Sequence, residues 1–205
     1  MAENYTYTTI EDATTAIFKD RGSKFLAYAF PIVDENDVKI KLKELKAEHP
    51  KAVHHCYAYR IGVDGNRYRT VDDGEPSGSA GRPILGQIDS ACLTNVAVIV
   101  VRYFGGTLLG MPGLINAYKT ATVEALNIAA KKEKWIEKRV ELSFEYPIMN
   151  EVKHLLQQSE SSIYKQDFQL FCNIIAGIPL KYLSTTETKL CQLRGLTLKH
   201  VESNP

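Results

Sequence analysis

The stretch DDGEPSGSAGRP, residues 72–83, contains the residue types and spacing best suited to binding an anion. Its glycines expose backbone N–H groups, its serines add hydroxyls, and it leads into a helix expected from about Pro83 to Cys92. The positive end of that helix and Arg82 would both attract negative charge. We therefore interpret this loop as an anion site. The alternative is a tight connection in which glycine only permits unusual backbone angles.

A second glycine-rich stretch, residues 100–113, follows a run of aliphatic residues. Arg102 comes after five of them, so we expect it to emerge at the end of a buried strand, beside Gly105 and Gly106. Ligand groups commonly gather at such strand ends in α/β architectures. The alternative is an arginine that is satisfied inside the protein by loop carbonyls or by a nearby carboxylate, since buried arginines are usually paired. The candidate carboxylates are Asp72, Asp73 and Glu75.

Histidines and clustered carboxylates raise the question of a metal site. His54 and His55 are adjacent in an expected strand, so their side chains point to opposite faces and cannot share one ion. No further His or Cys lies nearby at ligand spacing. Asp72, Asp73 and Glu75 are close enough to hold a hard cation, yet Asp-Asp-Gly is also ordinary turn chemistry. We therefore expect no metal and no cofactor.

Other polar residues in these stretches suggest binding more than catalysis. Ser77 lies in the first loop but has no base at a fixed spacing and no nucleophile elbow, so we assign no catalytic residue. Lys24, in the turn RGSKF, could add positive charge to the same surface. Tyr57 shares one face of its strand with His55 and Tyr59, which could form an aromatic platform for nucleic-acid bases.

The elements expected before residue 131 can position both glycine-rich loops. The only helix expected before the first loop is amphipathic, begins after an N-cap at Asp34 and ends before Pro50. The strand at 95–104 lacks polar alternation between Val96 and Val101, so both of its faces should be buried. The remaining elements are two strands around a turn between 15 and 32, a hairpin of 52–62 and 66–71, and a helix that ends near 130.

The charged stretch KKEKWIEKR, residues 131–139, marks the expected boundary between domains 1–133 and 134–205. Beyond it we expect a strand, a helix, two strands, a helix capped by Gly195 and a last strand. The two strands in the middle are placed near 162–166 and at FQLFCNII, residues 168–175. The order βαββαβ predicts a ferredoxin-like split βαβ domain.

The composition limits the classes of partner. The chain has 205 residues, 44% of them hydrophobic, and a formal net charge of +1, so a polyanion would have to be held by a local patch. Four widely spaced cysteines, an acidic start without an apolar leader, and a longest aliphatic run of six residues predict a cytoplasmic protein that is not in a membrane. Eight of the 13 glycines fall between Gly74 and Gly113, where the two loops lie.

Three blocks, AVHHCYAYRIG, DDGEPSGSAGRPIL and VVRYFGGTLLGMPGLINAY, together closely resemble the signature of the YigZ/IMPACT family, and RGSKFLAYAFPI resembles its opening block. The resemblance covers about residues 15–130. It implies an α+β protein built of two-layer α/β sandwiches. The first domain would be like the fourth domain of elongation factor G and like GHMP kinases, and the second like the ferredoxin-like fifth domain of elongation factor G.

The resemblance also implies a functional surface and a cellular process. Eukaryotic relatives regulate translation by restraining a starvation-responsive initiation-factor kinase, with the help of an RWD domain that these 205 residues do not include. Bacterial relatives have no settled biochemical function. The positions that match the family blocks, and that we expect to form the functional surface, are His54, Tyr57, Arg60, Asp73, Glu75, Ser77, Gly78, Gly81, Arg82, Arg102, Gly105 and Gly106.

Three functions fit these residues. The first, which we favour, is a non-enzymatic, translation-associated regulator that contacts RNA, the ribosome or a translation factor through the glycine-rich loops. The second is a small enzyme acting on a phosphorylated or otherwise anionic substrate, with Asp73 or Glu75 binding a metal or acting as a base. The third is a protein-interaction module, which an exposed apolar patch away from the glycine loops would favour. The oligomeric state is not specified by the sequence.

Overall fold

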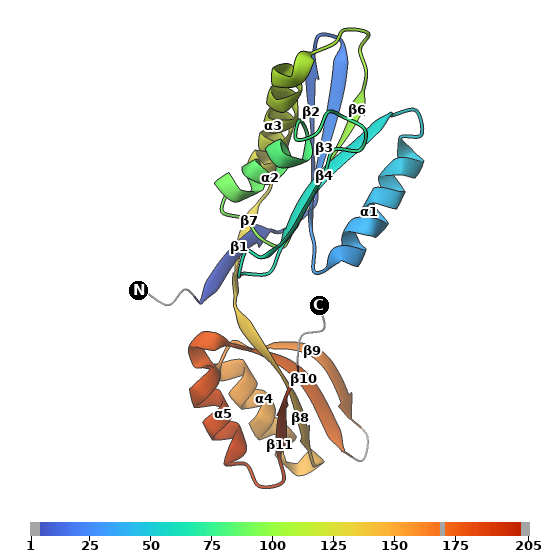
Figure 1. Ribbon diagram of the computed structural model, residues 1–205. Coiled ribbons are helices and arrows are strands. Elements are labelled where there is room, and N and C mark those ends of the chain that lie inside the picture. The colour runs from blue at the N-terminus through green and yellow to red at the C-terminus, as the bar shows by residue number, and fades with distance from the viewer. Residues whose placement is uncertain (1–4, 169–170, 202–205) are drawn as a thin grey trace. The chain divides into compact units, whose positions relative to one another are not determined.

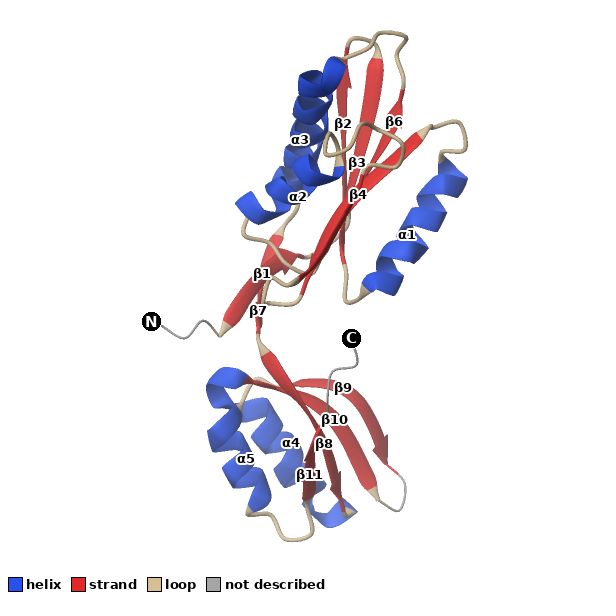
Figure 2. Cartoon of the chain, in the orientation of Figure 1, coloured by secondary structure: helices blue, strands red, loops and turns tan. Residues whose placement is uncertain are grey.

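The computed structural model describes residues 5–168 and 171–201 and divides the chain into two compact units. One unit is Tyr7–Lys134, and the other contains Trp135 onward together with Tyr5 and Thr6. Helices and strands occur in both units (Figures 1 and 2), so the α+β class is confirmed. No helix in the described ranges is long and apolar enough to cross a membrane.

The first unit is built on a five-stranded antiparallel sheet with the order β2-β3-β6-β4-β5. The central strand is β6 (Val96–Tyr103), and residues 96–101 are buried on both faces as expected. The other strands are β2 (Thr14–Asp20), β3 (Ser23–Pro31), β4 (His54–Ile61) and β5 (Arg67–Val71).

Helices cover both faces of this sheet, so the unit has one layer more than the expected two (Figure 2). On one face α2 (Gly81–Ser90) and α3 (Gly110–Ile128) pack on small and aliphatic side chains of β3, β4 and β6. On the other face α1 (Glu35–Glu48) packs through Val38 and Leu45. A strand that is apolar on both sides requires cover on both sides, because exposed aliphatic surface is unfavourable in water.

Most element boundaries follow the sequence signals, and the exceptions lie near glycines and charged residues. Asp34 is the N-cap of α1, as predicted, and it forms a capping box with Asp37. The helix α2 begins at Gly81, two residues before the expected Pro83, and α3 begins at Gly110, inside the glycine-rich stretch 100–113. The two-stranded sheet of β1 (Thr6–Ile10) and β7 (Lys131–Trp135) was not expected, because β7 is mostly charged and lacks an apolar alternation.

The second unit is a four-stranded antiparallel sheet with the order β11-β8-β10-β9 and with α4 and α5 packed on its core. This is the split βαβ topology. Its elements are β8 (Glu137–Phe144), a 3-10 turn (Tyr146–Ile148), α4 (Met149–Gln158), β9 (Ser162–Phe168), β10 (Cys172–Pro179), a 3-10 turn (Leu180–Tyr182), α5 (Leu183–Cys191) and β11 (Thr197–His200).

Two details of this unit differ from the sequence prediction. The strand placed at 168–175 begins at Cys172, Phe168 belongs to β9, and residues 169–170 lie outside the described ranges. Gly195 has a left-handed backbone (φ +86°), but α5 ends earlier, with Gln192 at its C-cap. Gly195 therefore serves the turn into β11 and does not cap the helix.

Candidate functional site

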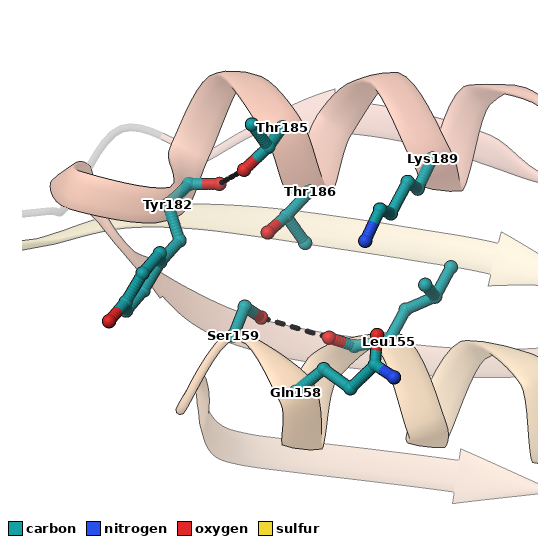
Figure 3. Close-up of a pocket in the computed structure, with 7 residues that line it drawn as sticks. All are labelled: Leu155, Gln158, Ser159, Tyr182, Thr185, Thr186 and Lys189. Atoms are coloured by element: carbon teal, nitrogen blue, oxygen red, sulfur yellow. Dashed lines mark hydrogen bonds between the residues drawn. The ribbon is translucent and has the colours of Figure 1, made fainter.

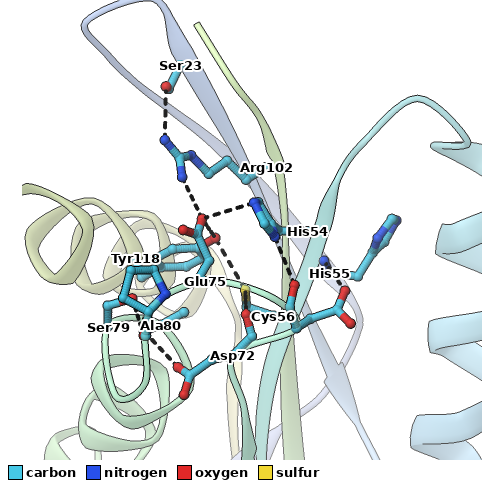
Figure 4. A network of polar contacts seen from close by, with 12 residues as sticks. Ser23, His54, His55, Cys56, Asp72, Glu75, Ser79, Ala80, Arg102 and Tyr118 are labelled. Carbon is cyan, nitrogen blue, oxygen red and sulfur yellow. Dashed lines mark hydrogen bonds and ion pairs between the residues drawn. The ribbon is translucent and has the colours of Figure 1, made fainter. Parts of the chain in front are cut away.

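The donors of the first glycine-rich loop bind a carboxylate of the chain itself (Figure 4). Asp72, which directly follows β5, accepts hydrogen bonds from the backbone N–H groups of Gly78 (2.8 Å), Ala80 (3.0 Å) and Gly81 (2.8 Å). The sequence motif predicts that these groups bind an external anion. In this structure the anion at the N-terminus of α2 is the Asp72 carboxylate, which occupies these three backbone donors.

Hydrogen bonding sets the charge state of Asp72. Burial by itself would raise the pKa of this carboxyl, but the three N–H donors and the nearby positive charge of Arg82 outweigh burial and lower the pKa below its ordinary value of 3.8. Asp72 is therefore ionised at neutral pH. Arg82 is exposed, so its guanidinium also faces solvent at the start of α2.

Asp73 connects the loop to β4 through two hydrogen bonds. The Asp73 carbonyl accepts a hydrogen bond from His54 Nδ1 at 2.8 Å, and its carboxylate accepts one from the His55 backbone N–H at 2.7 Å. Asp73 and Gly74 both have left-handed backbones, with φ of +43° and +88°. Asp is among the few residues other than glycine that tolerate this conformation, which supports the turn interpretation of Asp-Asp-Gly.

A buried ion pair lies behind the loop. Arg102 Nη1 donates to Glu75 Oε1 at 2.6 Å, and the Tyr118 hydroxyl donates to the same oxygen at 2.7 Å (Figure 4). The side chains of Arg102 and Glu75 are only 6% and 3% exposed. His54 Nε2 lies 4.0 Å from Glu75 Oε1. The arginine is thus paired inside the protein with one of the predicted carboxylates, while its buried Nε has no hydrogen-bond partner among the described residues.

Ser23 and Cys56 complete this network and, like Tyr118, are not among the residues predicted from the sequence. Ser23 Oγ lies 3.5 Å from Arg102 Nη2 and accepts a hydrogen bond from the Gly105 N–H. Cys56 Sγ lies 2.9 Å from the Asp72 carbonyl and 3.3 Å from the Tyr118 hydroxyl. Burial raises the pKa values of Cys56 and Tyr118 far above their usual ranges. Both groups stay protonated at neutral pH and act as hydrogen-bond donors.

Close backbone approach explains two of the glycines. A Cβ atom at Gly105 would lie 1.9 Å from the carbonyl carbon of Gly22, in the turn between β2 and β3. At Gly81 a Cβ atom would lie 2.7 Å from the backbone nitrogen of Val71. Neither distance is compatible with a side chain, so both glycines are required for packing. Gly78 and Gly106 instead have left-handed backbones, with φ of +78° and +85°.

Three predicted residues lie outside this network. Arg60 is at the other end of β4, where it pairs with Asp89 at 2.6 Å and stacks on the Tyr68 ring. Tyr57 is on the α1 side of the sheet, with its side chain against apolar neighbours. Lys24 is half-buried and pairs in register with Tyr103, one residue from Arg102 along the sheet.

The exposed side chains near the second loop are mainly apolar. Phe104, Leu108, Met111 and Ile115 are all exposed, and Leu108 reaches 84%. We refer to these four residues as the β6–α3 rim. A spacing of four residues places Met111 and Ile115 on one side of the start of α3, and Leu108 lies in the loop just before this helix. The rim adjoins the glycine loop itself, whereas the interaction-module hypothesis expected an apolar patch away from it.

The contacts of this network suit a binding surface of fixed structure better than a catalytic site. The carboxylate and guanidinium that would serve an anionic substrate are paired with each other, which disfavours the enzyme alternative. Among the described residues no group of three or more His, Cys, Asp or Glu side chains is placed to hold a metal ion. Ser77 and Arg82 are exposed beside the loop and remain available to a partner.

Comparisons with known proteins agree with the sequence blocks. Residues 21–126 match the Impact N-terminal domain. The IMPACT family member YigZ of Escherichia coli is 31% identical over 178 residues, 86% of this chain and 87% of that protein. Human Protein IMPACT is 36% identical over 96 residues, which are 44% of this chain but 29% of that protein. A crystal structure described as a hypothetical protein is 28% identical, covers 98% of this chain and 100% of its own, and has a TM-score of 0.76.

Proposed function

This chain belongs to the IMPACT family, and we propose that it is a cytoplasmic regulator of translation that works by binding a component of the translation machinery. Family membership supports the process, because eukaryotic relatives act on translation. The chain spans less than a third of human Protein IMPACT, so the activity of that whole protein is not transferred to it. We propose only that the domain shared with that protein contributes to regulation by binding a component of the translation machinery.

One observation carries the binding mode. Asp72, Glu75 and Arg102 form hydrogen bonds and an ion pair inside the protein. The β6–α3 rim and Arg82 are exposed. Internal pairing holds the first loop in place, and a loop held in place loses little conformational entropy when a partner binds. The contact surface that we propose is therefore the outer side of residues 72–82 together with the β6–α3 rim.

The composition of that surface bears on the kind of partner. Leu108, Met111 and Ile115 offer apolar contact, which is typical of the core of a protein interface. Arg82 could pair with a phosphate, and the Phe104 ring could stack on a base, as in proteins that bind single-stranded RNA. We propose a protein component as the main contact and RNA as a secondary one.

Co-sedimentation of the purified full chain with ribosomes tests this function. The double variant Leu108→Glu/Met111→Glu should reduce the bound fraction at least tenfold, because it places charge in the apolar contact. The matched control is Ile128→Glu, which changes an exposed apolar residue (61% exposed) at the far end of the same helix and should bind normally.

A second variant separates the two kinds of contact. Arg82→Glu should weaken binding less than the rim variant does, and the loss should shrink as salt is raised. If Arg82→Glu abolishes binding while the rim variant does not, RNA is the principal partner. Equal retention of wild-type protein and the rim variant on ribosomes would refute the proposed surface.

A further inference from the structure

The second unit contains a cavity between its two helices. It has a volume of about 300 Å³ and lies between the end of α4 and the start of α5 (Figure 3). That volume is at the lower limit of typical small-molecule sites. The lining residues are Leu155, Gln158, Ser159, Tyr182, Thr185, Thr186 and Lys189.

Two donors from α5 point into this cavity without a partner. Thr186 is only 4% exposed, and within residues 5–168 and 171–201 its hydroxyl has no hydrogen bond. Lys189 lies three residues later, and its ammonium group points into the same space. Over the same ranges Lys189 has no carboxylate within ion-pair distance.

Two other hydroxyls of the lining are already used. Thr185 donates to the Tyr182 carbonyl at 2.9 Å, and Ser159 donates to the Leu155 carbonyl at 3.0 Å (Figure 3). Of the serine and threonine hydroxyls in the lining, that of Thr186 is therefore the one without a hydrogen bond among the described residues. The Thr186 side chain is almost fully buried while its hydroxyl faces the cavity, so this hydroxyl is available to a ligand or an ordered water.

The charge and shape of the lining define the ligand. The seven residues include one cation and no carboxylate, which favours a negatively charged group. Leu155 and the ring of Tyr182 add apolar surface beside the donors. We infer that this cavity binds a small organic oxyanion, with a carboxylate or phosphate accepting from Lys189 and Thr186 and a short apolar body against Leu155 and Tyr182.

Nuclear magnetic resonance titration of the full chain tests this site. The probes are butyrate and butyl phosphate, which share one body and distinguish a carboxylate from a phosphate. Butanol controls for the body, and sodium chloride controls for ionic strength. Butyrate, butyl phosphate or both should cause saturable amide shifts in α4 and α5.

Variants then connect binding to the two donors. Lys189→Gln should weaken binding at least tenfold and Thr186→Val at least threefold, whereas Lys199→Gln on β11 should have no effect. Without ligand, Thr186→Val should be at least as stable as wild type, because the replaced hydroxyl has no partner. The inference is overturned if neither acid gives saturable shifts, if butanol gives the same shifts, or if Lys189→Gln binds as wild type does. None of these results depends on the ribosome experiment.

Discussion

Arg102 and Glu75 are buried together, and this limits what either residue can do for a partner. Their charges meet at 2.6 Å, and Tyr118 donates to the same carboxylate oxygen. Taking two charges out of water is costly, so a pair of this kind tolerates the loss of one member poorly. The role we assign to Arg102 is to hold the loop that contains Glu75 against the sheet.

Replacing Arg102 should therefore destabilise the first unit strongly. Arg102→Met leaves the Glu75 carboxylate buried without its cation, and we expect a loss of about 3 to 5 kcal/mol in the free energy of unfolding. Adding Glu75→Gln removes the uncompensated charge while keeping an acceptor for Tyr118. The double variant should recover at least about 1 kcal/mol in urea titrations. If the double variant is as unstable as the sum of the two single ones, the pair is not coupled.

The sequence identified most members of this site but not their use. Arg102 and Glu75 were both singled out, and their pairing was the alternative to ligand binding. Tyr118 was missed because it comes from α3, 43 residues beyond Glu75, and the burial of its hydroxyl depends on packing that spacing alone does not reveal. The available signal was a tyrosine on the buried face of a helix among Leu114, Ala117 and Ala121.

The loop before α2 and the helix itself depend on Asp72. The helix has no side-chain cap at Ala80, so the Asp72 carboxylate, reaching back across the loop, takes the place of an N-cap. This explains why the backbone donors of the expected anion-binding loop are already occupied within the chain. An Asp at the end of the preceding strand can satisfy the same donors as an external anion.

Asp72→Asn should reduce stability in a pH-dependent way. The pKa of Asp72 is lowered in the folded protein, so its contribution is present above the unfolded pKa and is lost as the pH falls through the folded pKa. We expect the variant to be about 1 to 2 kcal/mol less stable at pH 7, with a difference that shrinks below about pH 4. Asp12→Asn, at an exposed position, is the control in chemical denaturation at several pH values. A difference that stays constant down to pH 2 would contradict the assigned charge state.

The fold was largely predictable at the level of elements because its signals are local. The doubly buried strand β6, the N-cap at Asp34 and the split βαβ order are all correctly predicted from apolar periodicity and capping residues. The β1–β7 ribbon was not, because it pairs residues more than 120 apart and one strand is mostly charged. A mostly charged strand has no apolar alternation that would reveal it in the sequence. The likeness of the units to domains of elongation factor G remains a prediction.

The two units have separate apolar cores. Buried residues of the first unit form clusters between Ile10 and Ala129, and those of the second form one cluster between Val140 and Leu190. Each core contains one fully buried cysteine, Cys56 in the first and Cys172 in the second. Because hydrophobic burial is the main stabilising contribution, separate cores predict separate unfolding transitions.

Pulsed thiol labelling in urea, read by mass spectrometry, can follow both transitions in one sample. Ile88→Ala creates a cavity in the first core and should cost about 2 to 5 kcal/mol, which moves the labelling midpoint of Cys56 down by about 1 M urea or more. The midpoint of Cys172 should not move. Ile174→Ala should have the opposite effect, and the exposed Cys92 and Cys191 should label at every urea concentration. If either substitution shifts Cys56 and Cys172 together, the units unfold as one cooperative body, and a ligand bound between α4 and α5 would then also stabilise the glycine-rich loops.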